Sequence, residues 1–170
     1  MRAIMTLAVV FLLGGALPAS AQDIVVAQVL QRVCFTATNG LSWEASTWVA
    51  VENNARAMGL TLDTKSDDEY GKVFKYSLRQ PAGVYRVEVS STLGGESCDI
   101  YSPSGATKAH LEQTVAQSVG PEWSVVFGTR GPQWTRTVQR EGWQPLRQSI
   151  HVGQTSAGAL YVNHSSQPGG

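Results

Sequence analysis

Apolar residues recur at every second position on both sides of one short turn, and this pattern limits the fold more than any other part of the sequence. The turn segment 80–83 contains Pro81 and Gly83. The alternating apolar residues are Phe74, Tyr76, Leu78, Tyr85, Val87 and Val89. Because a period of two is that of a strand with one buried face, two such runs around a Pro/Gly turn predict a β-hairpin. The chain should therefore contain an antiparallel sheet whose apolar face needs a cover.

Three other segments have the 3.6-residue apolar period of an amphipathic helix. The first is expected from Ile24, the second from Ser46 or Thr47, and the third from Ser104 or Thr107, where a hydroxyl can cap the helix. Each segment runs into a glycine that can end a helix: Gly40, Gly59 and Gly120. The first two should form a helical hairpin.

Further strands are expected around Cys98 and Ile100 and over four later segments. These are 123–127, 134–138, 150–152 and 160–162. The polar, acidic segment 60–71 is expected to be a loop, and 163–170 a flexible tail. An echo of strand, strand, strand, helix is too weak to establish an internal repeat.

Because helices and strands are grouped rather than alternating, the order of elements predicts an α+β fold. We expect two N-terminal helices, a mainly antiparallel sheet of about six strands, and one further helix between two groups of strands. The alternative, a doubly wound parallel sheet, would need strict alternation of strands and helices.

Residues 1–21 have the pattern of a secretory signal peptide. Arg2 precedes an apolar run over 3–17, and Ala21 ends a small-residue cleavage sequence. The run is shorter than the roughly 20 apolar residues of a membrane-spanning helix. We therefore expect export to the periplasm or the extracellular space, with one globular domain over 22–162 and no membrane span after cleavage.

Cys34 and Cys98 are the two cysteines of the chain. In an exported protein such a pair predicts one disulfide, here between the first helix and the sheet. The alternative, a reactive thiolate, would need a neighbouring base that the sequence does not indicate.

The charge of the chain is balanced but unevenly spread. Beyond residue 21 there are 12 basic and 13 acidic side chains, which speaks against a nucleic-acid partner. The segment 22–122 has 8 basic and 12 acidic residues, and 123–170 has 4 basic and 1 acidic. The C-terminal part is therefore mildly basic.

Tryptophan and arginine interleave in this basic segment, and both residue types are frequent at binding hot spots. The candidate binding residues are Trp134, Arg136, Arg140 and Trp143. Trp134 and Arg136 should share one strand face. The competing interpretation is that the tryptophans fill the core and the arginines point outward.

No motif predicts a catalytic, cofactor or metal site. A Gly-x-Ser-x-Gly elbow, a phosphate loop and a zinc or calcium pattern are absent, and Asp63, Asp67 and Asp68 fit a solvated loop better than an ion site. The carboxylates, Glu88 and Asp99 among them, are not distinguished by any pattern. We expect a non-catalytic binding or accessory protein, of inhibitor or immunity type in one version, with a protein or glycan partner in the envelope. The alternatives are a small secreted hydrolase and a structural component of an envelope assembly.

Overall fold

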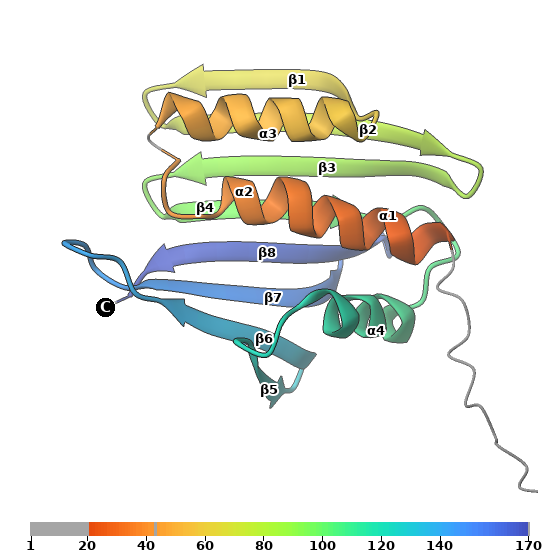
Figure 1. Ribbon diagram of the computed structural model, residues 1–170. Coiled ribbons are helices and arrows are strands. Elements are labelled where there is room, and N and C mark those ends of the chain that lie inside the picture. The colour runs from red at the N-terminus through yellow and green to blue at the C-terminus, as the bar shows by residue number, and fades with distance from the viewer. Residues whose placement is uncertain (1–20, 43, 170) are drawn as a thin grey trace, which may run out of the picture.

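The computed structural model describes residues 21–42 and 44–169 and shows one antiparallel sheet with helices on one of its faces (Figure 1). The strands are β1 (Thr61–Asp68), β2 (Gly71–Gln80), β3 (Gly83–Thr92), β4 (Gly95–Tyr101), β5 (Ser124–Gly128), β6 (Gly131–Val138), β7 (Leu146–Gln154) and β8 (Leu160–Pro168). They form an eight-stranded sheet in the order β1-β2-β3-β4-β8-β7-β6-β5. The predicted α+β class and antiparallel pairing are confirmed, with eight strands in place of about six.

The helices lie where the apolar periods and their end signals place them. The first helical stretch is continuous through α1 (Ala21–Val29), the π-helical η1 (Leu30–Cys34) and α2 (Phe35–Ala37). It is followed by α3 (Ala45–Ala57), which ends before Gly59 at a φ of +77°. The third helix, α4 (Lys108–Ser118), has Thr107 as its cap, because the hydroxyl of Thr107 accepts a hydrogen bond from the backbone N–H of His110.

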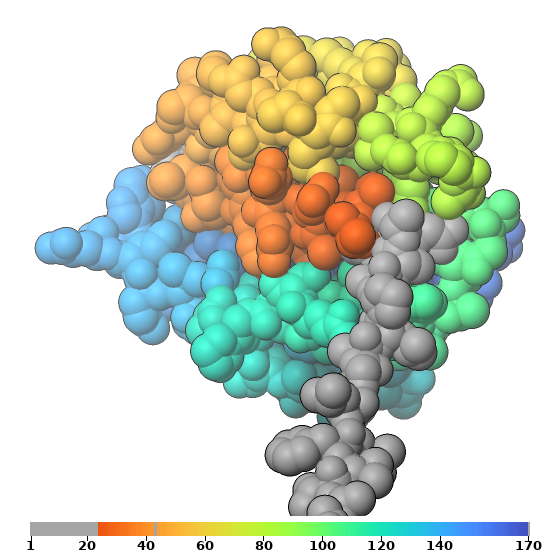
Figure 2. Space-filling view, turned by 45° about the vertical axis from the view of Figure 1, so that its right-hand side comes forward, coloured from red at the N-terminus to blue at the C-terminus, as the bar shows by residue number. Residues whose placement is uncertain are grey.

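The covering layer has the first helical stretch in its middle. In the space-filling view this stretch (red) lies between α3 on one side and α4 on the other (Figure 2). Beneath it lies one apolar core that combines residues of the helices with the inward side chains of the strands. Among the described residues no helix is long and apolar enough to cross a membrane.

The structure shows a repeated order of elements, one helix followed by four strands, which the sequence pattern was too weak to establish. Helix α3 precedes the four strands β1 to β4, and helix α4 precedes the four strands β5 to β8. The strand order is symmetrical about the central β4–β8 pair, so that β1 and β5 form the two edges. The sheet therefore consists of two four-stranded meanders joined at their last strands.

The expectation of a loop over 60–71 is wrong, because most of this segment forms the edge strand β1. All eight residues of β1 are exposed, so the strand has no buried face. A strand without a buried face has no alternation of apolar and polar residues, and the sequence signal for it is missing. Its charged side chains suit an edge that must not pair with other chains.

The expectation of a flexible tail over 163–170 is also wrong, because β8 continues to Pro168 in the middle of the sheet. His164 is 0% exposed and Ser166 is buried as well. The sequence signal for a strand is missing because the buried face is polar. Both side chains have hydrogen-bond partners in the interior, and the His164 ring also packs against the rings of Phe35 and Trp123.

The predicted disulfide is present between Cys34 of η1 and Cys98 of β4, with a Cα–Cα distance of 5.2 Å. It fastens the first helical stretch to the centre of the sheet, as expected. The predicted signal peptide lies, apart from Ala21, outside the described residues.

Candidate functional site

The structure does not bring the tryptophans and arginines of the sequence prediction together in one exposed patch. Trp134 and Arg136 share a face of β6, as expected, but it is the face that the helices cover, and Trp134 is 3% exposed. Arg140 lies in the β6–β7 loop, where its guanidinium donates to the carbonyl oxygens of Gly40 and Gln144. Trp143, in the same loop, is 64% exposed. Partner binding by these four residues stays an untested prediction.

Arg136 belongs to a chain of polar groups beneath the helices. Its Nε donates to Gln148 Oε1 at 2.6 Å, and Gln148 Nε2 donates to the carbonyl of Thr38 at 2.6 Å. The guanidinium also lies 4.6 Å from the ring centroid of Trp123 and pairs with Glu122 at 3.1 Å. These contacts hold the end of the first helical stretch against β6 and β7, which is a structural role.

His164 lies at the inner end of this chain. The hydroxyl of Thr38 donates to the carbonyl of Cys34 at 2.8 Å and lies 2.7 Å from His164 Nδ1. Because that hydroxyl has one hydrogen, Nδ1 carries the proton of the imidazole and donates to Thr38. Burial lowers the pKa of His164 to about 3, and Arg136 acts in the same direction. The ring is therefore neutral at physiological pH.

The opposite face of the sheet presents half-buried and exposed polar side chains. The strand registers align one residue from each strand in a line across all eight strands, here called the transverse row. From β1 to β5 it consists of Thr64, Lys75, Glu88, Asp99, Asn163, His151, Gln133 and Val126. Seven of these eight side chains are polar or charged, so the face offers hydrogen-bonding groups over the width of the sheet.

At the centre of the transverse row, where the two meanders meet, Asn163 Nδ2 donates to Asp99 Oδ1 at 2.9 Å. Partial burial raises the pKa of the Asp99 carboxyl, and the charge of Glu88 acts in the same direction. The hydrogen bond from Asn163 and the proximity of His151 oppose this shift. Glu88 is itself paired with Lys75 at 3.0 Å.

Two tyrosines lie beside this centre. Tyr101 and Tyr161 face each other across the β4–β8 pair with ring centroids 5.8 Å apart. Tyr161 also contacts His151 edge to face, with centroids 5.9 Å apart and planes at 78°. The absence of a side chain at Gly153 leaves room for the Tyr161 ring, because a Cβ at Gly153 would lie 2.4 Å from Tyr161 Cζ. The Tyr161 ring therefore packs directly over β7.

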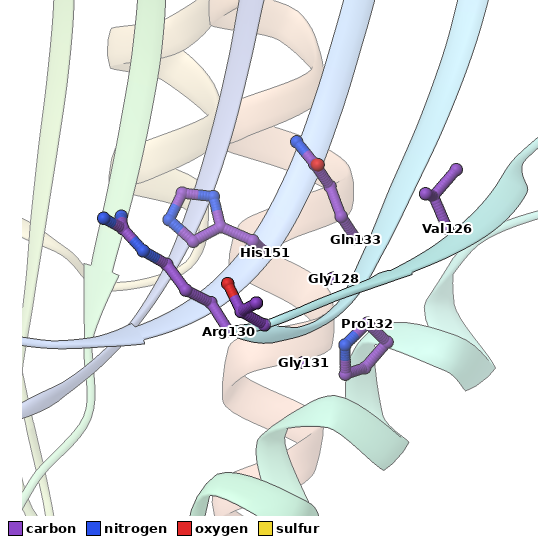
Figure 3. Close-up of a pocket in the computed structure, with 8 residues that line it drawn as sticks. Val126, Gly128, Arg130, Gly131, Pro132, Gln133 and His151 are labelled. Carbon is purple, nitrogen blue, oxygen red and sulfur yellow. The ribbon is translucent and has the colours of Figure 1, made fainter.

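A cavity of about 300 Å³ opens on this face at the β5–β6 hairpin. Figure 3 looks onto it with the helices behind the strands, and Arg130 and His151 extend side by side in front of the sheet. Partial burial lowers the pKa of His151; Arg130 and Lys108 act in the same direction, and Asp99 opposes them. The cavity therefore combines a neutral imidazole at pH 7 with one guanidinium.

Sequence reasoning did not find the transverse row, since its residues are far apart in the chain. Glu88, which no sequence pattern distinguishes among the carboxylates, faces away from the apolar side of its strand, and that is the side where the row lies. The polar positions of each alternating strand do indicate which residues face away from the core. Knowing which of these residues are neighbours across the sheet requires the strand order. Among the described residues no group of three or more His, Cys, Asp or Glu side chains can hold a metal ion.

Comparison of the chain with protein-family models, with curated proteins and with solved structures finds no match, so the candidate site is argued from its own geometry.

Proposed function

We propose that this chain is an exported, non-catalytic binding or accessory protein that holds its partner on the face of the sheet opposite the helices. The observation that carries the proposal is the transverse row with its tyrosine pair. Asp99, Asn163 and His151 are half-buried groups that still reach the surface, and they are set on paired strands rather than on loops. Groups held in this way are preorganised, which lowers the entropic cost of binding.

The disulfide supports the exported part of the proposal. Disulfides persist in oxidising compartments and are rare where thiols are kept reduced. The Cys34–Cys98 bond, together with the leader-like sequence over 1–21, is consistent with a protein of the periplasm or the extracellular space.

Photo-crosslinking in the producing cell tests the proposed face. A photoreactive amino acid replaces Arg86 or Arg147, exposed on opposite halves of the proposed face. Val49 of α3 and Gln113 of α4, exposed on the helical layer, are the matched control positions. We expect adducts, to protein or to saccharide, from the first pair of positions only.

Equal or exclusive crosslinking from Val49 and Gln113 would place the partner on the helices and overturn the proposal. Failure to obtain any adduct from Arg86 and Arg147 would have the same consequence. All four positions are exposed, so the substitutions leave the core intact.

One observation favours the competing function of a small hydrolase. Asp99 and His151 influence each other electrostatically, and their pKa values are shifted in opposite directions, up for the acid and down for the base. Such pairs occur at sites of general acid–base catalysis. Turnover of ester or glycoside substrates by the purified protein, lost in Asp99→Asn and in His151→Gln, would establish this alternative in place of the binding function.

A further inference from the structure

Arg130 is the uncompensated charge of the cavity at the β5–β6 hairpin, on the proposed binding face opposite the helices. In the part of the chain that the structure describes, its guanidinium has no ion-pair or hydrogen-bond partner. Its carbonyl oxygen instead accepts a hydrogen bond from Lys108, whose ammonium also pairs with Glu112 at 3.5 Å. The side chain of Arg130 is thus available to a ligand, while Lys108 of α4 holds its backbone in place.

The neighbours of Arg130 are neutral hydrogen-bonding groups. His151 carries no charge at neutral pH, and Gln133 contributes an amide from the adjacent strand β6 (Figure 3). One guanidinium with neutral donors matches a singly charged carboxylate, which it can bind through two parallel N–H···O bonds. A phosphate dianion would require a second cation, and Lys108 is already paired.

The surface next to the cavity suits a ring with hydroxyl groups. The ring of Tyr161 lies beside His151, and the Asp99–Asn163 pair follows along the transverse row. Tyrosine rings offer an apolar face together with a polar edge. The adjacent row of the same face adds the hydroxyl groups of Ser90, Ser97, Ser165 and Ser149.

We propose that Arg130, His151 and Gln133 bind the carboxylate of an acidic saccharide whose sugar ring lies against Tyr161. This inference rests on the proposed function and names the class of its ligand. A protein partner is less suited to this face, because the transverse row presents hydroxyl, amide and charged groups and only Val126 as an apolar side chain. Protein interfaces are instead depleted of charged residues at their centre, where this row has Glu88 and Asp99.

Isothermal titration calorimetry of the mature chain, residues 22–170, with a tetramer of galacturonic acid tests the inference. The matched ligand is the same tetramer with its carboxylates methyl-esterified, which keeps the shape of the sugar and removes the charge. We expect the acid to bind at least tenfold more tightly than the ester. Arg130→Gln should lower the affinity for the acid about tenfold or more, since a charge-assisted pair is lost.

Arg79→Gln is the control variant, because Arg79 is exposed on the same face of the sheet but on β2, four strands away from β7. It should leave the affinity within about twofold, since four strand spacings amount to roughly 19 Å. Equal losses in both variants would show diffuse charge attraction and overturn the assignment. Arg130 is exposed in a turn, and a thermal melt of Arg130→Gln checks that its fold is unchanged.

The remaining outcomes separate this inference from the proposed function. Equal binding of acid and ester, no binding of either, or equally tight binding of a poly-glutamate peptide overturns the acidic saccharide as ligand. If crosslinks nevertheless form from Arg86 and Arg147, the binding face stands and only the ligand class is lost. If they form solely from the helical layer, both proposals fail.

Discussion

At the scale of single residues, His164 makes the stability of the protein depend on pH. Its pKa in the folded state is about 3, whereas an unfolded histidine has a pKa of about 6.5. Between pH 6.5 and pH 3 this histidine is protonated in the unfolded chain but not in the folded protein. The free energy of unfolding therefore falls as the pH decreases below about 6.5. The loss amounts to at most about 1.4 kcal/mol per pH unit from this one group.

Urea unfolding of the wild type and of His164→Gln at pH 7.5, 6.5, 5.5 and 4.5 measures this contribution. The other titrating groups act on both proteins, so the difference between the two curves isolates the histidine. We expect that difference to favour the wild type most at pH 7.5 and to shrink steadily below 6.5. Parallel curves would show that His164 takes up its proton without leaving the fold.

At the scale of elements, β8 holds the two meanders together. It pairs with β4 on one side and with β7 on the other, and Ser166 donates to the buried carboxylate of Glu96 at 2.6 Å. Deleting residues 163–170 should therefore abolish cooperative unfolding and the near-ultraviolet circular dichroism of the aromatic core. A chain that lacks only residues 169–170 loses one backbone hydrogen bond, from Gly169 to Pro145, and should still unfold cooperatively. Native-like spectra for the longer deletion would show that these residues are dispensable after all.

At the scale of the whole molecule, the helical layer and the sheet are connected by the Cys34–Cys98 bond. The bond spans 64 residues, so it restricts the unfolded chain and should stabilise the fold by about 2–4 kcal/mol. The double variant Cys34→Ala and Cys98→Ala should lose this amount in urea unfolding. Reductant should lower the stability of the wild type similarly and leave the double variant unchanged. Equal stability of variant and wild type would mean that packing alone holds the layers.

Local patterns in the sequence determined the hairpin of β2 and β3, the three helical stretches and the cap at Thr107. These features depend on residues a few positions apart, where periodicity and capping act directly. The disulfide also followed from the sequence, since two cysteines allow only one intramolecular pair.

The tertiary structure alone decided which polar residues are buried and which lie on the face of the sheet opposite the helices. Trp134 and Arg136 lie on the face of β6 that the helices cover. Which face of a strand is covered depends on the strand order, which the sequence does not give. His164 is buried by partners more than 100 residues away in the chain, which include Thr38. Asp99, Asn163 and His151 meet only because β4, β8 and β7 are neighbours in the sheet. Long-range pairing therefore created the candidate site, whereas short-range propensity built the elements that support it.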